Sequence, residues 1–340
     1  TFCYLIDNSI STLSNNHLFY KYQFEADKVT EPYEPFLYII REAASKLKIN
    51  IDKLLDKAKV YPSHRVLFEA YLQNETPQRL DEIVFDELQY EYTQMRKSIC
   101  NLIKIISKDT PIVIAIADLQ HADFDTLELI KSISNNVVKS KAMFIYCYNK
   151  NYFFQDSARY DIWSSFTSLA EERFSIMELA QDFYDYEDNW YSPYFDLTVD
   201  ELIRISSLNF SFLNFNKAIK YASMARNLIL NNSVNEETHF AMIQILADSH
   251  FYLGEIDNAL TYYRILSEIA HRANNFEMLS EAYRKTALAY LRNYDVNTAT
   301  KLSSQCLKYA ALTKHEFQLL RAYHLLYCIS DKTTHPMDRD

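Results

Sequence analysis

Glycine is almost absent from this sequence. The chain of 340 residues holds a single glycine, Gly254, whereas average usage of about 7% would supply roughly two dozen. A loop that cradles phosphate groups needs glycines so that its backbone N–H groups can approach the phosphate oxygens. The sequence therefore excludes a glycine-rich phosphate-binding loop within these residues.

Three further features are lacking. No apolar run approaches the ~18–20 residues that a membrane helix needs, so we expect no membrane contact. The five cysteines are scattered singly, without metal-ligand spacing, which indicates buried free thiols, a reducing cytoplasmic location and no metal site. The net charge of −10 argues against a direct nucleic-acid surface.

The most informative stretch runs over residues 111–133. It starts with an unbroken apolar run, Ile112 to Ala117, which is typical of a parallel strand covered by helices on both faces. Asp118 ends the run, and Asp123 or Asp125 is placed to cap a following helix. The apolar residues of that helix are expected to face inward: Leu127, Ile130 and Ile133.

This pattern resembles the Walker B segment of the AAA-like signal-transduction ATPases known as STAND ATPases. In that family an apolar strand is followed by Asp-Asp-Leu-Gln-Trp-Ala-Asp and a leucine-rich helix. Two positions depart from it, since Ala117 stands where the family has its metal-binding aspartate and His121 where it has tryptophan. The matching residues are Asp118, Leu119, Gln120, Ala122, Asp123, Leu127 and Leu129.

The resemblance implies a nucleotide neighbourhood made by Thr1, Asp118 and Asn149. Asp118 would be the catalytic carboxylate that orients water or magnesium, Asn149 replaces an arginine near the phosphates, and Thr1 would end a Gly-Lys-Thr string. The alternative for Asp118, which we favour, is a strand-end carboxylate held by neighbouring loop amides. His121 and Asp123 are two residues apart, but a loop histidine beside a helix-capping aspartate is more common than a metal site.

The first part of the chain is expected to be an incomplete or degenerate P-loop NTPase-like parallel sheet over residues 1–180. Strands 2, 3, 4 and 5 of the family's 5-1-4-3-2 order would be residues 17–24, 112–117, 142–148 and 173–179. Residues 1–13, about 37–47 and much of 50–108 are predicted to be helical, with breaks at Pro62 and Pro77. The family's strand 1 and P-loop would lie upstream of Thr1, and only there would ATP and magnesium find their site. The alternative is a rebuilt sheet from which the P-loop has gone.

An acidic, aromatic segment over residues 181–197 is predicted to link two domains. Pro193 breaks it, and its aromatic residues are expected to pack on a neighbouring domain. The alternative is that this segment is a docking surface for a basic partner. The sequence leaves open whether the segment is a packed linker or such a surface.

From residue 198 to residue 332 the pattern is helical and repeats, before a tail at 333–340. Ala218, Ala259 and Ala299 recur at spacings of 41 and 40 residues. The units resemble tetratricopeptide repeats, in which small residues let two helices approach closely. Tyr294 replaces the glycine found at Gly254, and residues 316–330 are predicted to open a fourth unit. The second part is therefore expected to be an all-α solenoid.

The first helix of each repeat is expected to build an inner surface that holds a protein or peptide. Seven side chains that packing does not require are the candidate partner-binding positions: Asn209, Glu236, His239, Gln244, His250, Arg284 and Arg292. The sequence leaves self-association open.

Three functions remain compatible with the sequence. The first is a regulatory or signalling scaffold without catalysis, and the second is an ATP-binding switch whose P-loop and output domain lie outside these residues. In the resembling family that output is a transcription, adenylate cyclase or kinase domain. The third is a repeat protein that binds a peptide or small ligand on an α/β base. If the chain is an enzyme, the reaction is ATP hydrolysis, but the missing phosphate cradle favours no catalysis.

Overall fold

The computed structural model describes residues 17–25, 28–77, 87–137, 140–148, 164, 168, 197–229 and 235–334. The chain divides into two compact units, Thr1–Asp196 and Leu197–Asp340, and each is described by itself. The helix expected at 1–13, the strand expected at 173–179 and residues 181–196 of the expected linker lie outside the described residues.

The N-terminal unit contains a parallel sheet of three described strands, β1 (Leu18–Gln23), β2 (Ile112–Ala117) and β3 (Ala142–Tyr146). The strands lie side by side in the order β1-β2-β3, and both pairs are parallel. In the sequence, helices separate β1 from β2 and β2 from β3. The five residues from Ile112 to Ile116 are all buried, which confirms the prediction of a central parallel strand covered on both faces. The order also agrees with the expected adjacency of these three strands.

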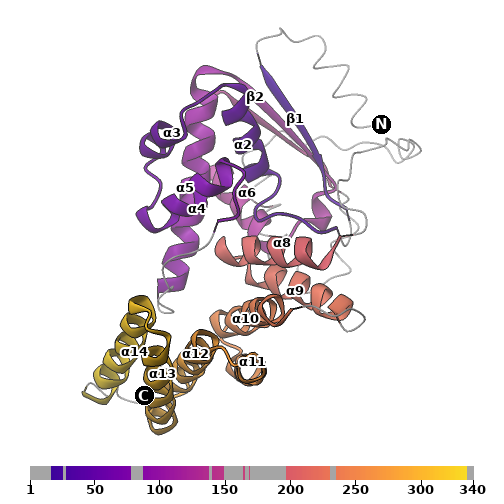
Figure 1. The fold of residues 1–340 in the computed structure, drawn as a ribbon. Helices are drawn as coiled ribbons and strands as arrows, with labels where there is room; N and C mark the ends of the chain where they lie inside the picture. Colours follow the sequence, from indigo (N-terminus) through magenta and orange to yellow (C-terminus); the bar gives the residue numbers. More distant parts are fainter. Residues whose placement is uncertain are drawn as a thin grey trace. The chain divides into compact units, whose positions relative to one another are not determined.

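Five α-helices of this unit are described: α2 (Phe36–Lys46), α3 (Ile51–Ala58), α4 (Pro62–Leu72), α5 (Leu88–Asp109) and α6 (Phe124–Asn136). Figure 1 shows α2, α3, α4 and α5 grouped beside the strands. Pro62 occupies the first turn of α4, where its missing N–H costs no hydrogen bond. Leu127, Ile130 and Ile133 of α6 are buried, as predicted.

The C-terminal unit consists, in its described part, of consecutive α-helices. They form the pairs α8 (Val199–Ser211) and α9 (Phe215–Ile229), α10 (Glu236–Tyr252) and α11 (Ile256–Arg272), and α12 (Phe276–Arg292) and α13 (Val296–Thr313), followed by α14 (Glu316–Thr334). Ala218, Ala259 and Ala299 are completely buried, so the small residues lie where helices meet. The predicted helical-repeat region is confirmed, including the first helix of a fourth unit.

The turns inside the three pairs share one geometry. Each contains a residue with a left-handed backbone five positions before the repeated alanine: Leu213 (φ 69°), Gly254 (φ 83°) and Tyr294 (φ 61°). In each turn the N–H of the next residue donates to a carbonyl five residues earlier, at 2.8–2.9 Å: Asn214 to Asn209, Glu255 to His250, and Asp295 to Tyr290. This bond belongs to a Schellman-type helix end, for which glycine is the favoured residue.

None of the helices in the described ranges combines the length and apolar composition that a membrane span requires.

Candidate functional site

Two groups of polar residues are candidates for a functional site, one at the end of β2 and one in the helical repeats. The Asp118 carboxylate accepts hydrogen bonds from Gln23 Nε2 at 2.6 Å and from Gln120 Nε2 at 2.9 Å. Gln23 lies at the end of β1, so the carboxylate joins two strand ends. Both donors are side-chain amides: Gln120 lies in the neighbouring loop, as expected, and Gln23 belongs to β1.

The backbone at Asp118 is left-handed, with φ 52° and ψ 42°. Asparagine and aspartate enter this region more readily than other residues with a side chain. Burial, and then the nearby Asp118 charge, raise the pKa of the Cys147 thiol next to it. The sheet end is therefore a place where one carboxylate is positioned firmly by its neighbours.

The helix after this turn begins at a capping aspartate. Asp123 accepts a hydrogen bond from the backbone N–H of Thr126 at 3.0 Å and another from its hydroxyl at 2.7 Å. Asp123, and not the alternative Asp125, is therefore the cap. In the parts of the chain that the structure describes, no three His, Cys, Asp or Glu side chains are grouped to hold a metal ion. Thr1 and Asn149 lie outside the described residues.

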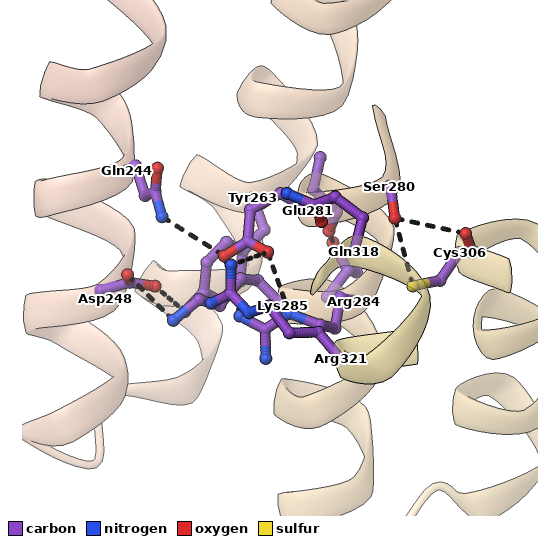
Figure 2. A network of polar contacts seen from close by, with 12 residues as sticks. Gln244, Asp248, Tyr263, Ser280, Glu281, Arg284, Lys285, Cys306, Gln318 and Arg321 are labelled. Atoms are coloured by element: carbon purple, nitrogen blue, oxygen red, sulfur yellow. Dashed lines mark hydrogen bonds and ion pairs between the residues drawn. The ribbon is translucent and has the colours of Figure 1, made fainter. Parts of the chain in front are cut away.

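A larger polar network crosses the helical repeats (Figure 2). Its centre is Glu281 of α12, whose two carboxylate oxygens accept hydrogen bonds from Arg284 Nε at 2.9 Å and Nη2 at 2.8 Å. Arg321 of α14 lies 3.1 Å from the same carboxylate, and Gln244 of α10 donates to it at 3.5 Å. One buried carboxylate thus connects the first helices of three successive repeats.

A second ion pair extends the network toward α11. Lys285 Nζ lies 3.1 Å from Asp248 of α10, and the Tyr263 hydroxyl donates to the other oxygen of Asp248 at 2.7 Å. Burial and then the Asp248 charge raise the pKa of Tyr263 well above its usual value, so this hydroxyl remains a donor. On the α14 side, Gln318 donates to Glu277 at 3.0 Å.

The network contains three cations, Arg284, Lys285 and Arg321, and three carboxylates, Glu281 and Asp248 at its centre and Glu277 on the α14 side. Burial alone would raise the pKa of Glu281, but the Arg284, Lys285 and Arg321 cations outweigh burial and lower it to about 2. The Arg321 side chain is 28% exposed while that of Arg284 is 3% exposed. Arg321 is therefore the cation of this network that solvent reaches most readily.

Of the seven predicted partner-binding residues, Gln244 and Arg284 belong to the network, and Glu236 lies close enough to His239 for its charge to act on the imidazole. Glu236 pairs with Arg272 at 3.4 Å, His250 with Glu255 at 2.6 Å, and Arg292 donates to the Phe251 carbonyl at 3.2 Å. Burial lowers the pKa of His239.

For two of the seven, the assumption that packing does not require the side chain is wrong. Asn209 is completely buried and donates to the Ile205 carbonyl at 2.9 Å. Arg284 is 3% exposed and is held by Glu281. A polar residue in a helix can be buried where another group of the same helix supplies its hydrogen-bond partner.

Sequence reasoning missed most of the network, including Asp248, Glu281, Lys285 and Arg321. A usable signal was present, because Glu281, Arg284 and Lys285 are spaced i, i+3 and i+4 and therefore share one helix face. The neighbours on α10 and α14 come from about 40 residues away, and the spacing within one helix does not reveal them.

No protein-family model matches this chain, and a search of the curated proteins found no match. Among solved structures, the crystal structure of the apo form of RapI is similar at 11% identity and a TM-score of 0.36, covering 88% of this chain and 73% of that chain. The crystal structure of Bacillus thuringiensis PlcR in complex with the peptide PapR7 and DNA is similar at 12% identity and a TM-score of 0.32, covering 87% of this chain and 99% of that chain. Both scores are too low to carry an argument about this chain.

Proposed function

We propose that this chain is a cytoplasmic regulatory protein whose helical repeats bind a protein or peptide, while the α/β unit acts as a STAND-like switch or scaffold without catalysis. The observation that supports it is the network centred on Glu281. It draws side chains from α10, α12 and α14, the first helices of three repeats, which are the helices expected to receive a partner.

The exposure of Arg321 favours an acidic partner. Its side chain is 28% exposed, whereas those of Arg284 and Lys285 are 3% and 10% exposed. Most of these groups are shielded from water, and charges interact more strongly in such surroundings than at an open surface. Arg321 is the group a partner carboxylate would meet first.

The repeats alone do not require such a network. Well-packed apolar side chains join helices at least as stably as buried ion pairs do, because burial of charge carries a desolvation cost. Recognition of a partner gives a reason for retaining charged groups here. A chain in which the network only joins repeats would bind no acidic ligand, and this difference can be tested.

The test is a selection of peptides from a random library displayed on phage, using the full chain as bait. We expect enrichment of peptides with acidic residues, and binding of the synthesised peptides weakened about ten-fold or more by Arg321→Ala. Arg272→Ala removes an exposed arginine of α11 and is the matched control. Failure to enrich any peptide, or equal binding by the two variants, would reject the proposal.

A second candidate is an ATP-binding switch that regulates transcription, an adenylate cyclase or a kinase. It is favoured by one observation, the positioned Asp118 carboxylate at the carboxyl end of the central strand of a parallel sheet. Such edges are where open α/β sheets bind ligands. Titration with a fluorescent ATP analogue and magnesium tests it, since this function requires saturable binding that Asp118→Asn weakens.

A further inference from the structure

Glu281 lies where an acidic partner would meet Arg321. Its carboxylate is 3.1 Å from Arg321 Nη1 (Figure 2), and Arg321 has the most exposed side chain of the three cations in the network. A partner carboxylate that pairs with this guanidinium must either displace Glu281 or lie beside it. In both cases Glu281 opposes binding, because neighbouring carboxylates repel each other.

The contact between Glu281 and Arg321 can open without leaving the buried carboxylate unpaired. Arg284 holds the same carboxylate through Nε at 2.9 Å and Nη2 at 2.8 Å. Such two-point pairs between arginine and a carboxylate are among the strong hydrogen bonds of proteins. The Arg284 side chain is 3% exposed, so a partner reaches Arg321 more readily. Displacement from Arg321 therefore leaves Glu281 paired with Arg284.

A second contact keeps the Arg321 guanidinium in position. Its carbon lies 5.5 Å from the centroid of the Phe317 ring, and the two residues are one helical turn apart in α14. Cation–π attraction holds a guanidinium over an aromatic face in this geometry. Arg321 is thus held from two sides, and loss of the Glu281 charge removes only one of the two contacts.

We propose that Glu281 is an autoinhibitory residue of the partner site, because its carboxylate pairs with Arg321 in the free chain and lowers the affinity for an acidic partner. The inference rests on the proposed function, since it requires an acidic partner that contacts Arg321. If Glu281 served only to position Arg321, its removal would weaken partner binding. The two roles therefore predict changes of opposite sign.

The test uses the acidic peptides selected on the full chain and measures their binding by fluorescence anisotropy at neutral pH. Glu281→Gln keeps the shape of the side chain, removes its charge and should tighten binding about ten-fold or more. Glu316→Gln removes an exposed carboxylate of α14 and is the control. It should change the affinity much less, because solvent screens an exposed charge. Equal tightening by the two variants would reveal a general charge effect and overturn the proposal.

Two further variants assign the effect to Arg321. Glu281→Gln introduced together with Arg321→Ala should tighten binding far less than it does alone. Glu281→Asp keeps a charge beside Arg284 but withdraws it from Arg321, so it should tighten binding to a smaller extent and replaces the glutamine variant if that chain does not fold.

The outcomes separate this inference from the proposed function. If Arg321→Ala leaves peptide binding unchanged, the proposed function fails, and the inference fails with it. If Arg321→Ala weakens binding while Glu281→Gln leaves it unchanged or weakens it, only the autoinhibitory role of Glu281 is overturned.

Discussion

The Lys285 ammonium lies 3.1 Å from the Asp248 carboxylate, and both side chains are at most 10% exposed. This ion pair joins the first helices of two successive repeats. Breaking a buried pair by removing one partner leaves a charge without its counter-ion, whereas replacing both partners by apolar groups does not. The connection between these repeats should therefore be highly sensitive to single substitutions and much less sensitive to the double one.

We expect Lys285→Met to lower the free energy of unfolding by about 3–5 kcal/mol, the usual cost of stranding a buried charge. The double variant Lys285→Met, Asp248→Leu should recover most of that loss. Urea denaturation of the full chain followed by far-UV circular dichroism measures both. Equal losses in the single and double variants would show that the pair has no coupling.

An exposed pair supplies the control. Arg272 and Glu236 lie 3.4 Å apart with side chains 56% and 42% exposed. Exposed pairs contribute less than about 1 kcal/mol because solvent screens them. Arg272→Met should thus change the unfolding free energy little.

The Glu281 carboxylate predicts how the stability of the repeats depends on pH. Its pKa is lowered from 4.5 to about 2 in the folded chain, since the neighbouring cations outweigh burial. A carboxyl with a depressed folded pKa stabilises the fold above its unfolded pKa, and this contribution is lost as pH falls from about 4.5 toward about 2. The full contribution is on the order of 3 kcal/mol, at about 1.4 kcal/mol per pKa unit.

Glu281→Gln should remove this part of the pH dependence. Urea denaturation at a series of pH values between 2 and 7 compares the two chains, and the wild type should lose more stability on acidification than the variant. If the free energies of unfolding of the two chains fell equally on acidification, the assigned role of Glu281 would be wrong.

The main elements were predictable from the sequence because each depends on a local pattern. The apolar run Ile112–Ala117 identified the central strand, and the alanines at 218, 259 and 299 identified the repeats. Asp123 was one of two caps considered, and only the geometry of Thr126 decided between them. These features need only a few neighbouring residues.

The contacts of the candidate sites were harder to predict because they join distant residues. Gln23 and Asp118 are 95 positions apart and meet only because β1 and β2 are adjacent in the sheet. Arg284 was predicted as a surface residue, yet it is buried beside Glu281, which also contacts Gln244 and Arg321 of two other helices. A single sequence gives the side chains of a helix face but not the neighbouring repeat that covers it. The nucleotide roles of Thr1, Asp118 and Asn149 stay predictions.

We expect residues 1–340 to show no ATP hydrolysis above background. The chain has one glycine, and Ala117 stands where the STAND ATPases that its sequence resembles have a metal-binding aspartate. Loss of even one phosphate-stabilising group commonly costs about 10²–10³ in rate. A coupled assay for released phosphate measures this. Turnover that Asp118→Asn abolishes would contradict the prediction, and Asp109→Asn, at the exposed end of α5, is the control.

Overpacking tests a buried helix contact in the repeats. Ala259 is completely buried at the start of α11, and inserting a large side chain at such a position typically costs about 1–3 kcal/mol or more. Ala259→Trp should therefore unfold at lower urea concentration than the wild type. Asn258→Trp, its neighbour on the exposed side of α11, should not.

Gly254 and Tyr294 occupy equivalent positions in two of the left-handed turns. Substitutions at these two positions should change the free energy of unfolding in opposite directions. Gly254 has φ 83°, and a Cβ built there would lie 3.9 Å from Arg292 Nη2, which is an ordinary contact. Gly254→Ala should therefore destabilise the chain through backbone strain alone, by about 1 kcal/mol. Tyr294 holds φ 61° with its side chain 63% exposed, so Tyr294→Gly relieves strain and removes little packing.

We expect Tyr294→Gly to raise the free energy of unfolding by up to about 1 kcal/mol, since glycine adopts this conformation without a steric cost, although its greater freedom in the unfolded chain offsets part of the gain. Urea denaturation of the two single variants and the double variant tests both signs. The two positions belong to successive repeats, so their effects should add approximately. Stabilisation by Gly254→Ala, or destabilisation by Tyr294→Gly, would show that side-chain contacts rather than backbone conformation determine which residue suits these turns.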